Sequence, residues 1–425
     1  GVVGCSVAYH VRRRLPGSSV LLLEQGRLGG GTTWHAAGLV GLMRASKMET
    51  LLSGVYGAQL YRELEETTGL SSGFQRCGSV SLARTPERME MLRRTASRAR
   101  SYGLEAREVP LAEVDALCGG LLSKDPSRFV GAISLPGDGA IDASNVCALL
   151  SAAARRAEAT VVEGVGVLEV APRAGGEEGF DVRTDQGDVL ASKVVNCTGQ
   201  WARMLGQGTG VSIPLHSCEH FYAYSRPGSL DVGPRFPVVR DPDGWLYFRP
   251  WSGGLLAGSF EPNAKVCFPR GRVPDKFEFS LLENDWDHFL PFLEDACETF
   301  PALADAQVDL LNGPESFTMD GSYLIGEAPG LRNYFVAAGM NSSGIASAGG
   351  AGYHVAEWVA RGTPANHLWS VDVRRVHGFM TNQRYLGERA GESLGDHYRM
   401  IAPKHERSTA RGVRRSPLFG ALAAR

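Results

Sequence analysis

Gly1-Val2-Val3-Gly4 and the apolar run Ser19-Val20-Leu21-Leu22-Leu23-Glu24 predict that the chain starts in a dinucleotide-binding fold. Gly1 and Gly4 match the last two glycines of a G-x-G-x-x-G fingerprint, in which glycine lets the backbone approach a pyrophosphate and lets helix and strand pack closely. Glu24 stands where an acid accepts hydrogen bonds from ribose hydroxyls. Alone, the four residues also fit an ordinary glycine turn. The first strand and glycine of the fingerprint would lie upstream, so we expect the chain as given to bind a nucleotide poorly.

Two further apolar runs support this interpretation. Residues 192–199 and 333–341 each end in small residues, at Gly199 and Gly339, and a helical pattern follows each run. Buried parallel strands have this composition, and nucleotides bind at their carboxyl ends. The sequence therefore predicts an α/β fold (α+β overall) with a Rossmann-like nucleotide domain.

The pattern changes in the middle of the chain. Short aromatic-rich segments at 221–224 and 245–249 predict antiparallel strands, and 160–190 predicts a small antiparallel sheet. Helices are expected at 47–68, 86–102 and 281–299, and Asp142 is a plausible N-cap. The nucleotide domain is thus expected to be discontinuous, with an inserted, mainly antiparallel substrate domain. The expected division is 1–72, 136–205 and 311–370 for the nucleotide domain, 73–135 and 206–310 for the substrate domain, and 371–425 for an extension.

Composition excludes several classes of function. The net charge of −2 gives no electrostatic case for nucleic acid or for an anionic membrane surface. No apolar stretch approaches the roughly 20 residues needed to span a bilayer. The eight cysteines form no C-x-x-C pair and suggest buried thiols in a reducing compartment. The histidines lack the spacing of metal ligands, so no metal is expected.

Several motifs carry a family resemblance. They are Thr33-Trp34-His35-Ala36-Ala37-Gly38-Leu39, Val195-Asn196-Cys197-Thr198-Gly199-Gln200-Trp201-Ala202, Gly313-Pro314-Glu315-Ser316-Phe317-Thr318 and Gly339-Met340-Asn341-Ser342-Ser343-Gly344. With them the chain resembles the sarcosine and dimethylglycine dehydrogenase group of FAD-dependent amine oxidoreductases, within the D-amino-acid oxidase fold superfamily. The resemblance implies FAD as cofactor, a mitochondrial matrix location and an electron-transfer flavoprotein as partner. Folate would belong to a carboxy-terminal region beyond this chain.

The resemblance also implies roles for individual residues. His35 would be bonded covalently to the flavin, although an isolated histidine would more often be an ordinary loop residue. The segment 339–344 precedes a helix, whose N-terminus would stabilise negative charge on the reduced flavin. The expected FAD-binding residues are Gly1, Gly4, Glu24, Thr32, Thr33, His35, Ala37, Gly38, Gly199, Gly339, Asn341, Ser342 and Gly344.

His220 and Tyr247 match positions that line the amine pocket in related enzymes. An imidazole and a phenol there could favour the deprotonated amine, the form able to give up hydride. They could equally be aromatic residues that pack a sheet face. Arg249, two residues from Tyr247, shares its strand face, where it could bind a substrate carboxylate or remain a surface arginine.

The expected function is oxidation of an N-methylated amino acid, such as sarcosine or dimethylglycine, by hydride transfer to flavin. An alternative comes from 214–222 and 283–289, which are similar to segments of the regulatory subunit of pyruvate dehydrogenase phosphatase. Under it, the chain would bind the phosphatase catalytic subunit and turn over nothing. The retained His35 favours the enzyme. An oxidase that passes electrons to oxygen is a third possibility.

Overall fold

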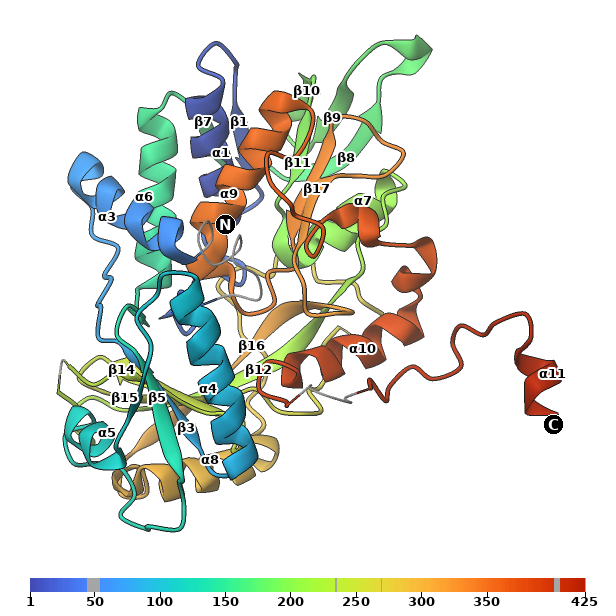
Figure 1. The fold of residues 1–425 in the computed structure, drawn as a ribbon. Helices are drawn as coiled ribbons and strands as arrows, with labels where there is room; N and C mark the ends of the chain where they lie inside the picture. The colour runs from blue at the N-terminus through green and yellow to red at the C-terminus, as the bar shows by residue number, and fades with distance from the viewer. Residues whose placement is uncertain (44–53, 234, 269, 401–405, 425) are drawn as a thin grey trace.

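The computed structural model describes residues 1–43, 54–233, 235–268, 270–400 and 406–424. Within this part of the chain, parallel strands and their helices form one half of the molecule, and an eight-stranded sheet forms the other (Figure 1). The segments between them run back and forth, so each half is built from separate stretches of sequence. The predicted α/β organisation with an antiparallel sheet is confirmed.

The parallel half contains two small sheets. β1 (Leu21–Glu24) pairs with β7 (Thr160–Glu163), and β11 (Val194–Asn196) pairs with β18 (Tyr334–Ala338), both in parallel. β17 (Leu324–Glu327) adds an antiparallel edge to β18. The three apolar runs predicted as strands therefore form β1, β11 and β18. The helices of this half are α1 (Val2–Arg14), α3 (Tyr56–Thr68), α6 (Ala143–Arg156), α7 (Ala202–Gly208) and α9 (Gly344–Arg361).

Local sequence explains where these helices begin and end. The Asp142 side chain accepts a hydrogen bond from the Asn145 N–H at 2.8 Å, so it caps α6 as predicted. α9 ends at Gly362, whose φ of +73° is left-handed, a conformation that glycine adopts at low cost. The part of the predicted helix 47–68 at residues 47–53 lies outside the described residues.

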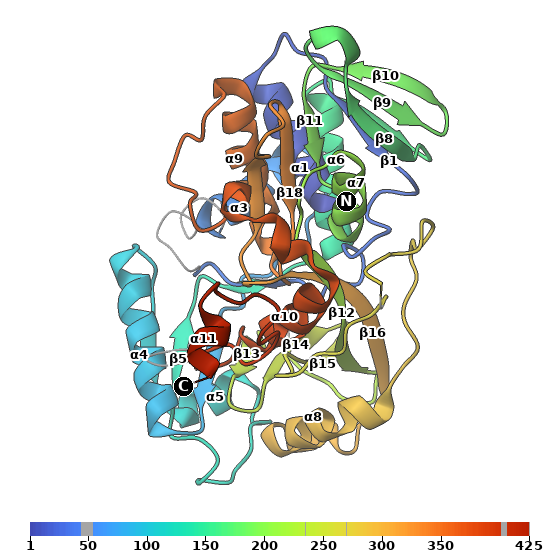
Figure 2. The same ribbon diagram turned by 90° about the vertical axis from the view of Figure 1, so that its right-hand side faces the viewer.

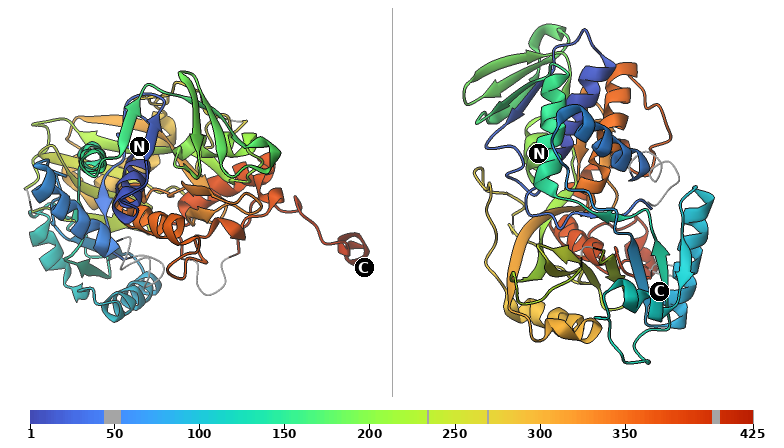
Figure 3. Two further views of the ribbon diagram at one scale, coloured as in Figure 1. Left: turned by 90° about the horizontal axis from the view of Figure 1, so that it is seen from above. Right: turned by 90° about the vertical axis from the view of Figure 1, so that its left-hand side faces the viewer.

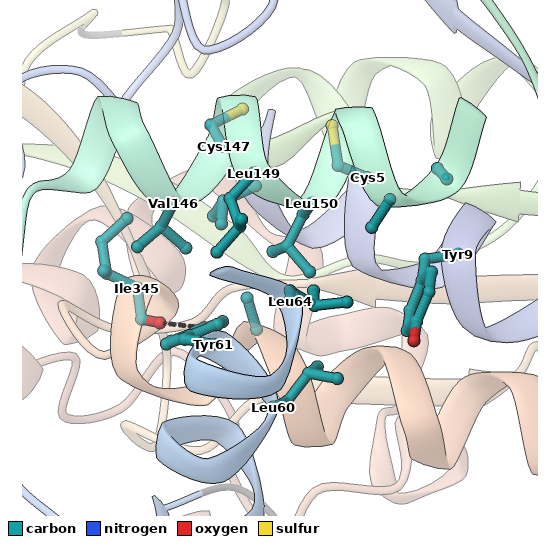
Figure 4. Packing of buried hydrophobic residues seen from close by; sticks show 14 of the residues in the cluster. Cys5, Tyr9, Leu60, Tyr61, Leu64, Val146, Cys147, Leu149, Leu150 and Ile345 are labelled. Carbon is teal, nitrogen blue, oxygen red and sulfur yellow. Dashed lines mark hydrogen bonds between the residues drawn. The ribbon is translucent and has the colours of Figure 1, made fainter. Parts of the chain in front are cut away.

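The core of this half lies between α1, α3, α6 and α9. Leucine and valine side chains of α3 and α6 meet there, and the Tyr61 hydroxyl donates to the Ile345 carbonyl at 2.6 Å (Figure 4). α1 and α9 approach closely because Gly352 faces Ser6 without a side chain between them. Residues at the N-termini of both helices line the same cavity.

A three-stranded antiparallel sheet extends from this half (Figure 2). It contains β8 (Val167–Pro172), β9 (Phe180–Thr184) and β10 (Gly187–Ala191), in the region 160–190 where such a sheet was predicted. A short antiparallel pair, β2 (Leu39–Val40) with β6 (Gly139–Ala140), follows the Thr33–Leu39 motif.

The eight-stranded sheet has the strand order β16-β12-β15-β14-β13-β3-β5-β4. One face packs against α5 (Leu111–Leu117) and α8 (Trp286–Thr299) through an apolar cluster. The other packs against α4 (Pro86–Ser101) at β3 and β5 and otherwise faces the parallel half. Its strands are β3 (Ser79–Ala83), β4 (Arg107–Val109), β5 (Gly131–Leu135), β12 (Leu215–Ser225), β13 (Val238–Asp241), β14 (Leu246–Trp251), β15 (Gly254–Ser259) and β16 (Val308–Thr318).

Two boundaries differ from the sequence-based expectation. α8 begins at Trp286 rather than at 281, because Asp285 accepts from the His288 N–H and caps the helix there. β16 pairs with β12 along its whole length, so the division expected at residue 311 falls inside a strand of the eight-stranded sheet.

Residues after 371 are more closely integrated than an extension. α10 (Gln383–Gly395) packs against β12 and β16. The buried residues Leu386, Ala390 and Leu394 recur every fourth position, a helical stripe that sequence analysis overlooked. α11 (Phe419–Ala423) stands away from the rest of the molecule (Figure 3). No helix within the described ranges is long and apolar enough to cross a bilayer.

The close α1–α9 contact predicts a difference between two glycine substitutions. A β-carbon at Gly352 would lie 2.7 Å from the Ser6 carbonyl carbon, whereas at Gly387 of α10 it would meet no heavy atom within 4 Å. Alanine gains about 1 kcal/mol of helix propensity at either site, but overpacking costs about 1–3 kcal/mol. Urea denaturation should therefore find Gly352→Ala less stable than Gly387→Ala by about 1–3 kcal/mol. Equal free energies of unfolding would contradict the close contact.

Candidate functional site

A cavity of about 1570 Å³ lies between the parallel half and the eight-stranded sheet. All fifteen residues that the sequence singled out for cofactor binding or catalysis line it. They are Gly1, Gly4, Glu24, Thr32, Thr33, His35, Ala37, Gly38, Gly199, His220, Tyr247, Gly339, Asn341, Ser342 and Gly344. Residues from distant parts of the sequence thus share one cavity, and their individual roles remain predictions.

One end of the cavity lies at the N-terminus of α1. The Val2 N–H donates to the Thr33 hydroxyl at 3.3 Å, and a β-carbon at Gly1 would lie 3.1 Å from the same oxygen. Glu24 ends β1 beside this turn and accepts from the Gly26 N–H at 3.3 Å. From here the cavity continues between β1 and β11, where its lining is mostly apolar.

The segment before α9 has an uncommon backbone. Asn341 and Ser342 have φ values of +45° and +61°, in the left-handed region that non-glycine residues rarely adopt. Asn341 stabilises this turn itself: its Oδ1 accepts from the Thr318 N–H at 2.8 Å, and its Nδ2 donates to the Gly339 carbonyl at 2.5 Å. The turn delivers the unpaired N–H groups at the start of α9 to the cavity, where they favour negative charge.

His35 lies against β16. A β-carbon at Gly313 would be 2.6 Å from both Nδ1 and Cε1 of His35, so only glycine leaves room for the ring. The Tyr222 hydroxyl donates to the His35 carbonyl at 3.1 Å. Burial, with a smaller contribution from nearby His220, lowers the pKa of His35 to about 4. The imidazole is therefore neutral at physiological pH and its nitrogen lone pair is available.

Arg249 has a different place from the one its strand face suggested. Its Nη1 donates to the carbonyls of Ala37 at 2.5 Å and Ile141 at 3.1 Å, and its Nε donates to Pro250 at 2.9 Å. The guanidinium is absent from the residues that line the cavity. Arg249 therefore braces the loop that carries His35, and the interpretation as a carboxylate ligand is wrong.

His220 and Tyr247 belong to a chain of three polar groups. The Tyr247 hydroxyl lies 3.2 Å from His220 Nε2, and Glu315 Oε2 lies 3.5 Å from His220 Nδ1. A carboxylate at Nδ1 favours the tautomer with its proton on that nitrogen, which leaves Nε2 to accept from Tyr247. Burial raises the pKa of Glu315, while His220 and Ser342 oppose that rise. Burial also raises the pKa of Tyr247, so the phenol keeps its proton.

Glycine again provides the space. Gly258 lies directly opposite Tyr247 on β15, and a β-carbon there would be 2.2 Å from the Tyr247 ring. The tyrosine can therefore lie flat over the sheet toward His220.

Aromatic side chains complete this end of the cavity. Phe260 lies 5.0 Å from the His220 ring, 5.3 Å from Tyr247 and 5.0 Å from Tyr398, measured between ring centroids. His397 and Tyr398 follow α10, and the Arg88 guanidinium fixes them by donating to the Tyr398 carbonyl at 2.8 Å. A segment expected to be an extension thus forms one wall of the site.

Sequence analysis assigned no role to several of these residues. Glu315 lay in a quoted motif, and its position on β16, in register with Cys218 of β12, could be known only from the strand pairing. For His397 and Tyr398 the available signal was the four-residue apolar spacing of α10. The described residues contain no group of three histidine, cysteine, aspartate or glutamate side chains arranged to hold a metal ion.

Comparison with known proteins places these features in context. The model of a family described as FAD dependent oxidoreductase matches residues 1–358, and that of an FAD dependent oxidoreductase central domain matches 361–416. The solved structure of glycine oxidase from Geobacillus kaustophilus has a TM-score of 0.72 and 26% identity, and the match covers 89% of this chain and 97% of that one.

Three curated relatives match along nearly the whole chain. The mitochondrial pyruvate dehydrogenase phosphatase regulatory subunit of Mus musculus is 37% identical over 100% of this chain and 48% of its own length. The formaldehyde-forming 4-methylaminobutanoate oxidase of Paenarthrobacter nicotinovorans is 38% identical, over 100% and 50%. The mitochondrial sarcosine dehydrogenase of Mus musculus is 35% identical, over 99% and 46%. The chain spans about half the length of the curated relatives it matches.

Proposed function

Since this chain belongs to the family of FAD-dependent oxidoreductases, we propose that it oxidises the C–N bond of an N-methylated amino acid. The observation that carries the proposal is the Glu315–His220–Tyr247 chain, which faces the same cavity as the neutral His35. The polar chain offers a buried base for an amine substrate, and the uncharged His35 ring offers a buried nucleophile.

The cavity suits FAD. At one end, Gly1, Gly4 and Glu24 line the cavity at the N-terminus of α1, where glycines suit the approach of a pyrophosphate and an acid suits a ribose. At the other, the strained turn before α9 directs unpaired N–H groups to where the isoalloxazine would carry negative charge. When bound, FAD supplies the acceptor for the hydride that the substrate carbon loses.

The residues of the chain would prepare the amine. An ammonium ion cannot give up hydride, so its proton must leave first. Tyr247 can accept a hydrogen bond from the amine while its own proton faces His220, so the chain can pass a proton toward Glu315, whose carboxylate favours the protonated chain. Phe260, His397 and Tyr398 exclude water from this step.

We further propose that His35 holds the flavin through a covalent bond from its ring. The low pKa of His35 keeps a ring nitrogen unprotonated, and Gly313 fixes the ring orientation. Covalent attachment would raise the flavin potential and prevent loss of the cofactor.

The mouse regulatory subunit, 37% identical, supports a second candidate function. Under this second proposal, the present chain would bind the catalytic subunit of pyruvate dehydrogenase phosphatase and would catalyse no reaction. The polar chain between Glu315 and Tyr247 favours the enzyme. For the enzyme we propose the mitochondrial matrix, from the names of two relatives, with an electron-transfer flavoprotein as acceptor. In an alternative form of this proposal, the reduced flavin passes its electrons to oxygen, and the protein is an oxidase.

Anaerobic addition of substrate tests the function directly. Sarcosine, dimethylglycine and 4-methylaminobutanoate should be added separately to the full-length protein while the oxidised flavin absorbance is followed. At least one should bleach it, because the reduced flavin has no acceptor. Fully bound flavin that none of them bleaches would contradict the proposal, and binding to the phosphatase catalytic subunit would then be measured.

The covalent bond predicts a result that does not depend on activity. After acid precipitation of the full-length protein, flavin fluorescence should remain with the polypeptide, and His35→Ala should release it. Gly313→Ala should also reduce the covalent fraction because the added methyl group displaces the ring. Flavin that dissociates freely from the unaltered protein would refute the attachment.

Glu315 predicts a pH effect. A negative charge favours the protonated forms of its neighbours, so Glu315→Gln should move the acid limb of flavin reduction about 1 pH unit lower. The limiting rate should also fall about 10-fold or more, because His220 loses the partner that orients it. Glu219→Gln is the matched control, since Glu219 lies next to His220 on β12 and outside the cavity lining. If the acid limb of the pH profile is unchanged in Glu315→Gln, a charged Glu315 takes no part in removing the amine proton.

A further inference from the structure

The substrates considered above carry a carboxylate as well as an amine. A carboxylate that leaves water needs a cation or several hydrogen-bond donors, and arginine binds it best through two parallel N–H groups. Since Arg249 is engaged by backbone carbonyls, another residue must serve. The described cationic side chains that line the cavity are Arg98, Lys193, Arg240 and Arg272.

Arg240 is the one of these four that lies beside the amine end of the site. It stands directly opposite Tyr247 in the antiparallel pair of β13 and β14, and paired residues project from the same face of a sheet. Lys193 lies beside β11 and donates to the Val359 carbonyl, Arg98 is exposed on α4, and Arg272 lies in a loop. The Arg240 charge also opposes the rise that burial imposes on the pKa of Tyr398, which lines the same wall.

The Arg240 guanidinium has unused donors. It donates no hydrogen bond to any residue that the structure describes, and its one ion pair, from Nη1 to Asp138 Oδ2, is 3.6 Å long. Asp138 does not depend on this pair. Its Oδ1 accepts from the Leu42 N–H at 2.8 Å, and its Oδ2 accepts from the Ser79 hydroxyl at 2.6 Å. Asp138 thus steers Arg240 without occupying it.

There is also room above the guanidinium. A β-carbon at Gly41 would lie 3.1 Å from Arg240 Nη2, so a glycine keeps the loop after β2 from covering the donors. The Arg240 side chain is 21% exposed, and that exposure opens into the cavity.

We propose that Arg240 binds the carboxylate of the amine substrate as a two-pronged donor and so selects amino acids over simple amines. The inference rests on the proposed amine oxidation, and it makes Arg240 a specificity-determining residue. The site would then hold the substrate between a cation on β13 and the Tyr247–His220 pair on β14 and β12.

Binding of an unreactive probe tests this without turnover. Propionate and its neutral counterpart propionamide should be titrated into the full-length flavoprotein while the flavin difference spectrum is recorded. Arg240→Gln should weaken propionate about 10- to 100-fold, the range for a lost charge-assisted pair, and leave propionamide within about twofold. Arg98→Gln, an exposed arginine at the same cavity, is the matched control and should change neither.

The decisive quantity is the ratio of propionate affinity to propionamide affinity within one variant, because damage to the fold would weaken the binding of both probes. An unchanged ratio in Arg240→Gln overturns the proposal. If that variant does not fold, Arg240→Lys replaces it: an intermediate ratio supports the site and an unaltered ratio refutes it. The two proposals can fail separately. If Arg240→Gln abolishes the preference for propionate over propionamide, but no N-methyl amine bleaches the flavin of the unaltered protein, the carboxylate site is supported and the proposed amine oxidation is refuted.

Discussion

The carbonyl groups of Ala37, Gly38 and Ile141 converge on one guanidinium, that of Arg249. This contact joins the loop that carries His35 to the strand that carries Tyr247, and so sets the distance across the cavity. Gly38 has a φ of +68°, and a β-carbon there would lie 2.1 Å from the Ile141 carbonyl oxygen. Burial opposes the charge of Arg249 and lowers its pKa, and the carbonyl dipoles compensate for the lost water. Without this cation the carbonyls of Ala37 and Ile141 would lose their charged donor, while the Gly38 carbonyl would keep the Ile141 N–H as its partner.

The parts of the fold that could be predicted are those encoded in short stretches of sequence. The apolar runs that end at Glu24 and Gly199 are strands, Asp142 caps its helix, and the motif around His35 identifies the sarcosine and dimethylglycine dehydrogenase group, which the relatives confirm. Each of these signals is carried by neighbouring residues, whose backbone preference and burial do not depend on distant partners.

The parts that could not be predicted depend on strand pairing and on distant contacts. The alternation of β14 places Arg249 on the same face as Tyr247. The carbonyls that accept from its Nη1, however, belong to residues more than one hundred positions away. Arg240 becomes a neighbour of Tyr247 only through the register of β13 and β14. Glu315 reaches His220 in the same way, across β12 and β16. The sequence around an arginine or glutamate does not show whether its side chain faces a buried site or solvent.

The walls of the cavity come from distant stretches of chain, which include α1, β1, the loop near His35, strands β12 to β14, the segment from Glu315 to Gly344, and the pair His397–Tyr398. Contacts between such distant stretches form late, since each one closes a long loop of chain. The cavity is therefore complete only when residues separated by almost four hundred positions, Gly1 and Tyr398 among them, are in place together. Capture of the cofactor therefore depends on the joining of the two halves, since residues of both line the cavity and neither half alone encloses it.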